Sequence, residues 1–73
     1  MLNPYYILTS KDLQLEETVV RSYGIACLID NALQQRIDDI STDKNTVEDG
    51  ISRFNEYALL PEHFADAVDD LLP

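Results

Sequence analysis

The spacing of hydrophobic residues changes along the chain from a repeat of two, typical of strands, to a repeat of about 3.6, typical of helices. In the first half, a short apolar and aromatic run covers residues 5–9, and Pro4 precedes it as at a strand start or sheet edge. Thr18–Ile29 gives the clearest strand. We expect its larger residues to face the core, namely Val19, Arg21, Tyr23, Ile25, Cys27 and Ile29. Between these runs, Asp12–Glu17 fits either a continuing strand or a loop.

A third strand is predicted from Leu33 to Ile40, after a two-residue hairpin turn at Asp30-Asn31. Asp and Asn tolerate the positive φ angles that such turns require. By simple alternation Leu33 and Ile37 share one face, whereas Ile40 falls on the other. Either a β-bulge near Asp38-Asp39 shifts the register, or the strand ends there.

Helical spacing fills the second half. One apolar stripe follows the steps i, i+4, i+7 and i+11, and consists of Val47, Ile51, Phe54 and Ala58. Ser41, Thr42 and Asp43 precede it as candidate N-caps, and Pro61 suits the first position of a second helix. The second stripe consists of Phe64, Val68 and Leu71. We therefore expect helices over about residues 43–58 and 61–72.

The only two glycines lie inside predicted elements, where glycine lowers stability unless packing requires it. Gly24 in the second strand indicates a bulge or the close approach of another group. Gly50 in the first helix leaves room for a strand or for the second helix.

These elements predict one small α+β domain over residues 1–73, with its strands within residues 4–40. We expect a three-stranded antiparallel sheet, β-β-β, with the two C-terminal helices packed on one face. A chain of this length buries only about 60% of the surface that it exposes when unfolded. Self-association through a leftover apolar face, as a homodimer, is therefore one way to gain stability.

Charge narrows the function classes. Fourteen Asp and Glu residues oppose five Lys and Arg residues, giving a net charge of −9. Direct nucleic-acid binding draws its affinity from clustered Lys and Arg, so we do not expect it. The sequence shows no run long and apolar enough to span a membrane and no signal peptide, which predicts a cytoplasmic protein.

Three segments resemble a family of short, uncharacterised bacterial proteins, classed as a domain of unknown function. They are Tyr23-Gly24-Ile25, then Ile40-Ser41-Thr42-Asp43, then the stretch from Pro61 to Leu71. The family shows Tyr-Gly-Ile, Ile-Ser-Thr-Asp and Pro-x-His-Leu-x-Asp-Val-Ile-Glu-Asp in this order. Here Phe64 replaces the Leu of the last motif. The resemblance implies no activity.

Candidate chemistry is sparse, and we expect no cofactor. His63 is the only histidine and lies three residues before Asp66, so the two share a helix face. A small metal-binding or catalytic protein centred on this pair is one alternative, but a metal site needs three or four converging ligands, and a structural role for His63 is favoured. Cys27, on the predicted core face, is expected to act as a small hydrophobe.

The acidity supports a non-enzymatic protein-interaction module with an unidentified protein partner, of basic charge in the sharpest form of the hypothesis. The candidate surface is the acidic side of the last helix, Glu62, Asp66, Asp69 and Asp70. Tyr5 and Tyr6 on an edge strand form a second candidate, suited to self-pairing. Two alternatives stay open: acidity that serves solubility alone, and an acidic mimic of nucleic acid.

Overall fold

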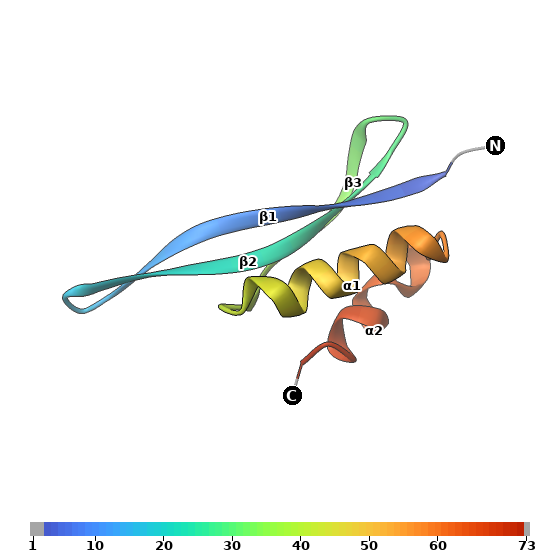
Figure 1. Cartoon of the computed structure of the whole chain (residues 1–73). Coiled ribbons are helices and arrows are strands. Elements are labelled where there is room, and N and C mark those ends of the chain that lie inside the picture. Colours follow the sequence, from blue (N-terminus) through green and yellow to red (C-terminus); the bar gives the residue numbers. More distant parts are fainter. Residues whose placement is uncertain (1–2, 73) are drawn as a thin grey trace.

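The computed structural model describes residues 3–72, which form a three-stranded antiparallel sheet followed by helices (Figure 1). The strands are β1 (Pro4–Leu15), β2 (Thr18–Ile29) and β3 (Ala32–Ser41), and they lie side by side in that order. The helices are α1 (Lys44–Glu56), the short 3₁₀ helix η1 (Pro61–His63) and α2 (Phe64–Asp69), which continues η1 directly. The predicted α+β architecture is confirmed.

Both hairpins are tight. β1 and β2 pair without a break from Pro4 opposite Ile29 to Leu15 opposite Thr18. The ambiguous segment Asp12–Glu17 is therefore strand as far as Leu15, and Glu16 and Glu17 form the turn. The predicted turn between β2 and β3 is confirmed, because Asp30 and Asn31 both have positive φ angles, 53° and 65°. Two successive residues in this conformation give the type I′ turn, whose twist matches that of paired strands.

β3 is bulged twice. Tyr23 lies opposite Ser41 and Ile25 opposite Ile37, so three residues of β3 span a single residue of β2. This settles the alternative left open by the sequence in favour of a bulge, with Asp39 at φ 55°. A second shift places Leu33 opposite Leu28.

The second shift reverses the alternation of side chains along β3. Leu33 consequently lies on the opposite face from Ile37 and is 60% exposed. The prediction that these two residues share a face is wrong, because a bulge adds a residue that alternation does not count.

The helices begin as predicted but end earlier. Asp43 caps α1 by accepting a hydrogen bond from the Asn45 N–H at 3.1 Å. The helix ends at Glu56 and not near residue 58, because Ala58 has φ 50°, outside the helical region. The second helix starts with a 3₁₀ turn and stops at Asp69, three residues before the predicted end.

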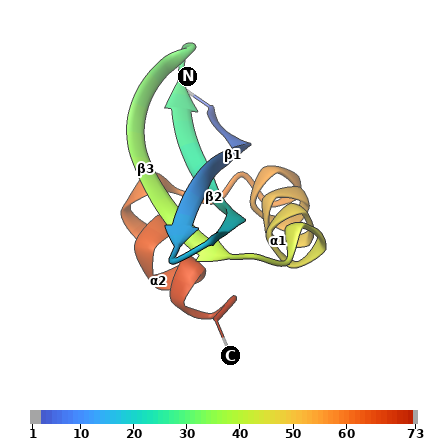
Figure 2. The ribbon, with the colours of Figure 1, turned by 90° about the vertical axis from the view of Figure 1, so that its left-hand side faces the viewer.

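The core lies between the helices and the sheet, whose arrangement is seen along the strands in Figure 2. The strands and both helices contribute buried side chains to it. Its buried members are Tyr6, Ile25, Cys27, Ile40, Val47, Phe54, Phe64 and Val68. The predicted inward face of β2 is confirmed at Ile25 and Cys27, both 0% exposed. It is wrong at Val19, which is 59% exposed, and at Arg21, also exposed.

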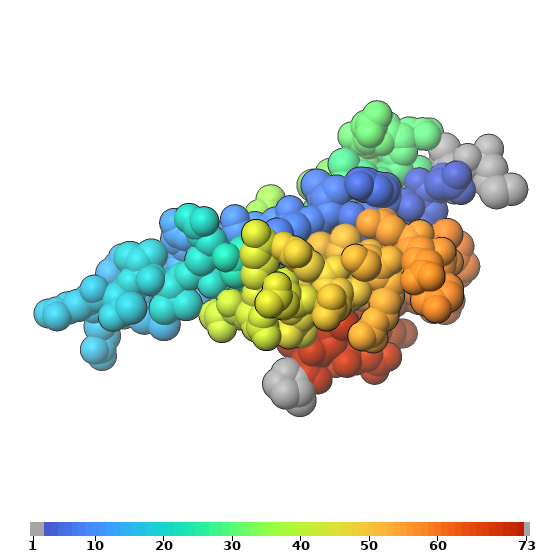
Figure 3. Space-filling model, viewed as in Figure 1, coloured from blue at the N-terminus to red at the C-terminus, as the bar shows by residue number. Residues whose placement is uncertain are grey.

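Val19 and Arg21 are exposed because the β1–β2 hairpin runs past the helices as an arm (Figures 1 and 3). The described chain is correspondingly elongated, with extents of 48 × 25 × 17 Å. None of the helices within residues 3–72 has the length and apolar character needed to cross a bilayer.

Candidate functional site

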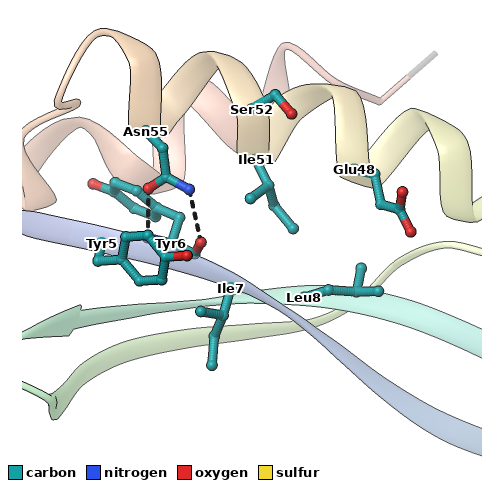
Figure 4. Close-up of a pocket in the computed structure, with 8 residues that line it drawn as sticks. All are labelled: Tyr5, Tyr6, Ile7, Leu8, Glu48, Ile51, Ser52 and Asn55. Carbon is teal, nitrogen blue, oxygen red and sulfur yellow. Dashed lines mark hydrogen bonds between the residues drawn. The ribbon is translucent and has the colours of Figure 1, made fainter.

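A groove runs between strand β1 and helix α1 (Figure 4). It has a volume of about 300 Å³ and is open to solvent along one side. β1 supplies one wall and α1 the other, and the lining residues are Tyr5, Tyr6, Ile7, Leu8, Glu48, Ile51, Ser52 and Asn55. Ile51 and Glu48 point from the helix toward the strand, so the groove combines an apolar floor with one carboxylate.

The side chain of Asn55 closes one end of this groove by pairing with the backbone of Tyr6. The Tyr6 N–H donates to Asn55 Oδ1 at 2.8 Å, and Asn55 Nδ2 donates to the Tyr6 carbonyl oxygen at 2.9 Å (Figure 4). The amide thereby replaces the next strand of the sheet at this residue. An unpaired strand edge is a template for pairing with other chains, and Asn55 removes one residue of it.

The two bonds to Asn55 also show which backbone groups of β1 face outward. In an antiparallel pair, residues alternate between exchanging hydrogen bonds with the partner strand and pointing those groups away from it. Because Tyr6 points away from β2, so do Leu8, Ser10 and Asp12. Asn55 is the only side chain in residues 3–72 that bonds to these outward groups. Beyond it, the edge of β1 is open.

Tyr6 itself is not available to a partner. Its side chain is 1% exposed, and its hydroxyl donates to the Leu59 carbonyl oxygen at 2.6 Å. Burial raises the pKa of this phenol well above its ordinary value, with a smaller contribution from the neighbouring Cys27. The expectation that Tyr6 forms part of a partner surface is wrong, since it packs against Phe54 and Phe64 in the core. Tyr5 points the other way and is 59% exposed.

The acidic residues of the last helix do lie on the surface. Glu62, Asp66, Asp69 and Asp70 are all exposed. Phe64 and Val68 face the core, so the helix is divided into an apolar and an acidic side. Within residues 3–72 no Lys or Arg forms an ion pair with any of these four carboxylates. We refer to Glu62, Asp66, Asp69 and Asp70 as the acidic face.

The structure does not bring further ligands to His63. Its Nε2 lies 3.8 Å from Glu62 Oε1, and both side chains are exposed. Within residues 3–72, no group of three or more His, Cys, Asp or Glu side chains is placed to hold a metal ion. His63 contributes to the fold through its backbone N–H, which donates to the Leu60 carbonyl oxygen at 2.9 Å.

Cys27 lies in the core as predicted, with a side chain that is 0% exposed. Asn55, by contrast, was missed by sequence reasoning. It follows Ile51 by four residues and so lies next to the apolar stripe of α1, which is the signal that could have identified it. A polar residue beside such a stripe is placed to reach whatever the helix packs against.

These features define the class: a small α+β domain with a three-stranded meander, a helical cover and an open sheet edge along β1. The chain belongs to the Family of unknown function (DUF6514), whose model matches residues 1–73. No curated protein and no solved structure matches it.

Proposed function

We propose that this chain is a non-catalytic protein-interaction module that presents its acidic face to a basic protein partner. The observation that carries the proposal is the acidic face itself: four exposed carboxylates without an ion pair to Lys or Arg in residues 3–72. Charges that the fold leaves unpaired are available to a partner of opposite sign.

The distribution of the charge supports the same proposal. Three basic residues, Arg21, Arg36 and Lys44, pair with acids elsewhere, on the sheet and on α1. No Lys or Arg in residues 3–72 therefore pairs with the acidic face, in a chain with a net charge of −9. This field speeds the encounter with a basic partner and repels nucleic acid. We place the module in the cytoplasm, where a lone thiol such as Cys27 stays reduced.

The groove offers little to an enzyme. Glu48, its one carboxylate, lies 3.5 Å from Lys44 Nζ, and both side chains are about half exposed. Ser52, the one serine among the lining residues, has no histidine in the lining to act as its base. These observations favour binding over catalysis.

Affinity capture with a charge-reversed variant tests the proposal. Partners captured by the wild-type chain at low salt are identified, and each is titrated against the wild type and against Asp66→Lys/Asp69→Lys. We expect a basic protein whose affinity falls by about tenfold or more in the variant. Capture should also disappear near 1 M salt, where the Debye length is only about 3 Å.

A matched control separates the acidic face from net charge. Glu16→Lys/Glu17→Lys makes the same change in net charge at the turn of the β1–β2 arm, far from α2 in the fold. If this control weakens the partner as much as the α2 variant does, or if salt leaves capture unchanged, the acidic face is not the binding surface.

A further inference from the structure

We propose that two copies of this chain join through their β1 edges, antiparallel and about a two-fold axis at Ser10, to form one continuous six-stranded sheet. This inference concerns a different surface from the acidic face, and its test gives results that are independent of the basic partner.

β1 is the regular edge of the sheet. Its pairing with β2 has no register shift over the whole strand. The other edge, β3, carries two bulges, which twist a strand edge away from regular pairing. A ladder of hydrogen bonds with another strand therefore requires β1.

The contact with Asn55 determines which residues of β1 can pair with a second copy. Asn55 occupies the outward groups of Tyr6, so a new ladder starts at Leu8. Outward groups then recur at Ser10 and Asp12. A two-fold axis at Ser10 pairs Ser10 with Ser10 of the second copy. It also pairs Leu8 of each copy with Asp12 of the other. The ladder fits between the Asn55 amides of the two copies.

The side chains on the outer face of β1 select this axis. About Ser10 the apolar outer-face residues of the ladder are placed symmetrically, so that Ile7 meets Leu13 of the second copy at both of its ends. An axis one residue later places Lys11 opposite Lys11 of the second copy, and like charges directly opposite destabilise a sheet.

The exposures show what such pairing covers. Ile7 is 38% exposed and Leu13 is half-buried, and the proposed pairing covers both side chains. The chain as a whole exposes 5116 Å². A compact monomer of 8.3 kDa exposes roughly 4600 Å². The excess of about 500 Å² belongs to the elongated chain, whose β1–β2 arm runs past the helices.

Charge also directs a second copy to this edge. β1 contains one basic and one acidic residue, Lys11 and Asp12, so its net charge is zero. The charge of −9 is carried by the rest of the chain. β1 is therefore the element along which two equally acidic copies meet with little local repulsion. The remaining long-range repulsion is screened by salt, so higher salt should strengthen the dimer.

Sedimentation of the full chain over a concentration series tests the proposal. We expect a dimer of twice 8.3 kDa that is favoured by salt. Ser10→Pro removes an outward N–H and costs no hydrogen bond to β2, so it should weaken the dimer by about tenfold or more and leave the fold intact. Ser10→Val, which keeps the N–H, should still dimerise. A wild type that stays monomeric at every concentration and salt overturns the proposal.

A cross-link gives a second measurement that does not depend on how Ser10→Pro folds. In the proposed pair the two Ser10 Cα atoms lie about 5.5 Å apart, within the range of a disulfide. Oxidised Ser10→Cys should therefore form a covalent dimer, whereas Lys11→Cys, displaced from the axis, should not. Equal cross-linking of the two variants would falsify this register. Loss of the basic partner in Asp66→Lys/Asp69→Lys with an unchanged dimer would leave this inference standing.

Discussion

At the scale of single residues, the two glycines lack side chains for different reasons. A Cβ at Gly24 would overlap the Ile37 carbonyl oxygen and lie 2.9 Å from Asp38 Cα, both backbone atoms of the bulge in β3. A Cβ at Gly50 would lie 2.6 Å from Leu71 Cδ1, the end of a flexible side chain. The β3 backbone beside Gly24 cannot move without breaking the sheet, whereas the Leu71 side chain beside Gly50 can rotate away.

We therefore expect Gly24→Ala to lower the free energy of unfolding by about 3 kcal/mol or more, the upper part of the range for overpacked sites. Gly50→Ala should stay within about 1 kcal/mol of the wild type, because the gain in helix propensity offsets the displacement of Leu71. Urea denaturation of both variants checks this. Equal stability of the Gly24 variant and the wild type would show that the bulge is free to relax.

Tyr6 gives stability a dependence on alkaline pH. Because burial raises the pKa of the folded phenol, the unfolded chain loses its proton first as the pH passes about 10. The stabilising effect is complete below that pH. It is then lost at about 1.4 kcal/mol per pH unit as the pH rises toward the folded pKa.

Urea denaturation at neutral pH and above pH 10 isolates this effect in Tyr6→Phe. The variant should lose about 1 kcal/mol at neutral pH with the Leu59 hydrogen bond, and should show a shallower alkaline decline than the wild type. Tyr5→Phe, which removes an exposed hydroxyl, serves as the control and should keep the wild-type decline. Identical slopes for wild type and Tyr6→Phe would contradict the assignment.

At the scale of elements, local chemistry decides the turns, and tertiary contacts decide where strands and helices end. The turn at Asp30-Asn31 and the cap at Asp43 follow from residue types alone, so both were predictable. The end of α1 was not, because Ala58 is a good helix former that is nonetheless held at φ 50°. The face of Leu33 was missed for the same kind of reason, a bulge set by packing.

The β2–β3 turn provides a prediction at this scale. Asn31 has φ 65°, a conformation that Gly adopts freely and that a β-branched residue resists. Asn31→Val should lower the free energy of unfolding by about 1–2 kcal/mol. Asn31→Gly should be at least as stable as the wild type. Thermal melts of the pair measure the difference, and matching melting temperatures for the two variants would argue against a type I′ turn.

At the scale of the whole molecule, the sequence predicted the layers but only part of the candidate sites. Alternation in β2 and the two helical stripes were enough for the α+β architecture. The exposure of the acidic face was predictable from helical spacing. A charged side chain on the solvent side of a helix does not depend on contacts with another element. The groove and its Asn55 closure could not be predicted, since they depend on how closely α1 approaches the edge of β1.

Salt distinguishes the two proposed interactions of the molecule. Screening should weaken the attraction between the acidic face and a basic partner, and should strengthen the pairing of two copies that each carry a charge of −9. The two surfaces lie on different elements, α2 and β1. A salt series of each measurement therefore assigns an observed complex to one surface or the other.

The bulge opposite Gly24 makes the identity of residue 24 depend on the length of β3 during evolution. Three residues of β3 span one residue of β2 there, and their backbone fills the space that a side chain at position 24 would need. A lineage can therefore acquire a side chain at position 24 only after β3 loses its two surplus residues. Among homologous sequences, the length of the third strand and the identity of residue 24 should therefore change together.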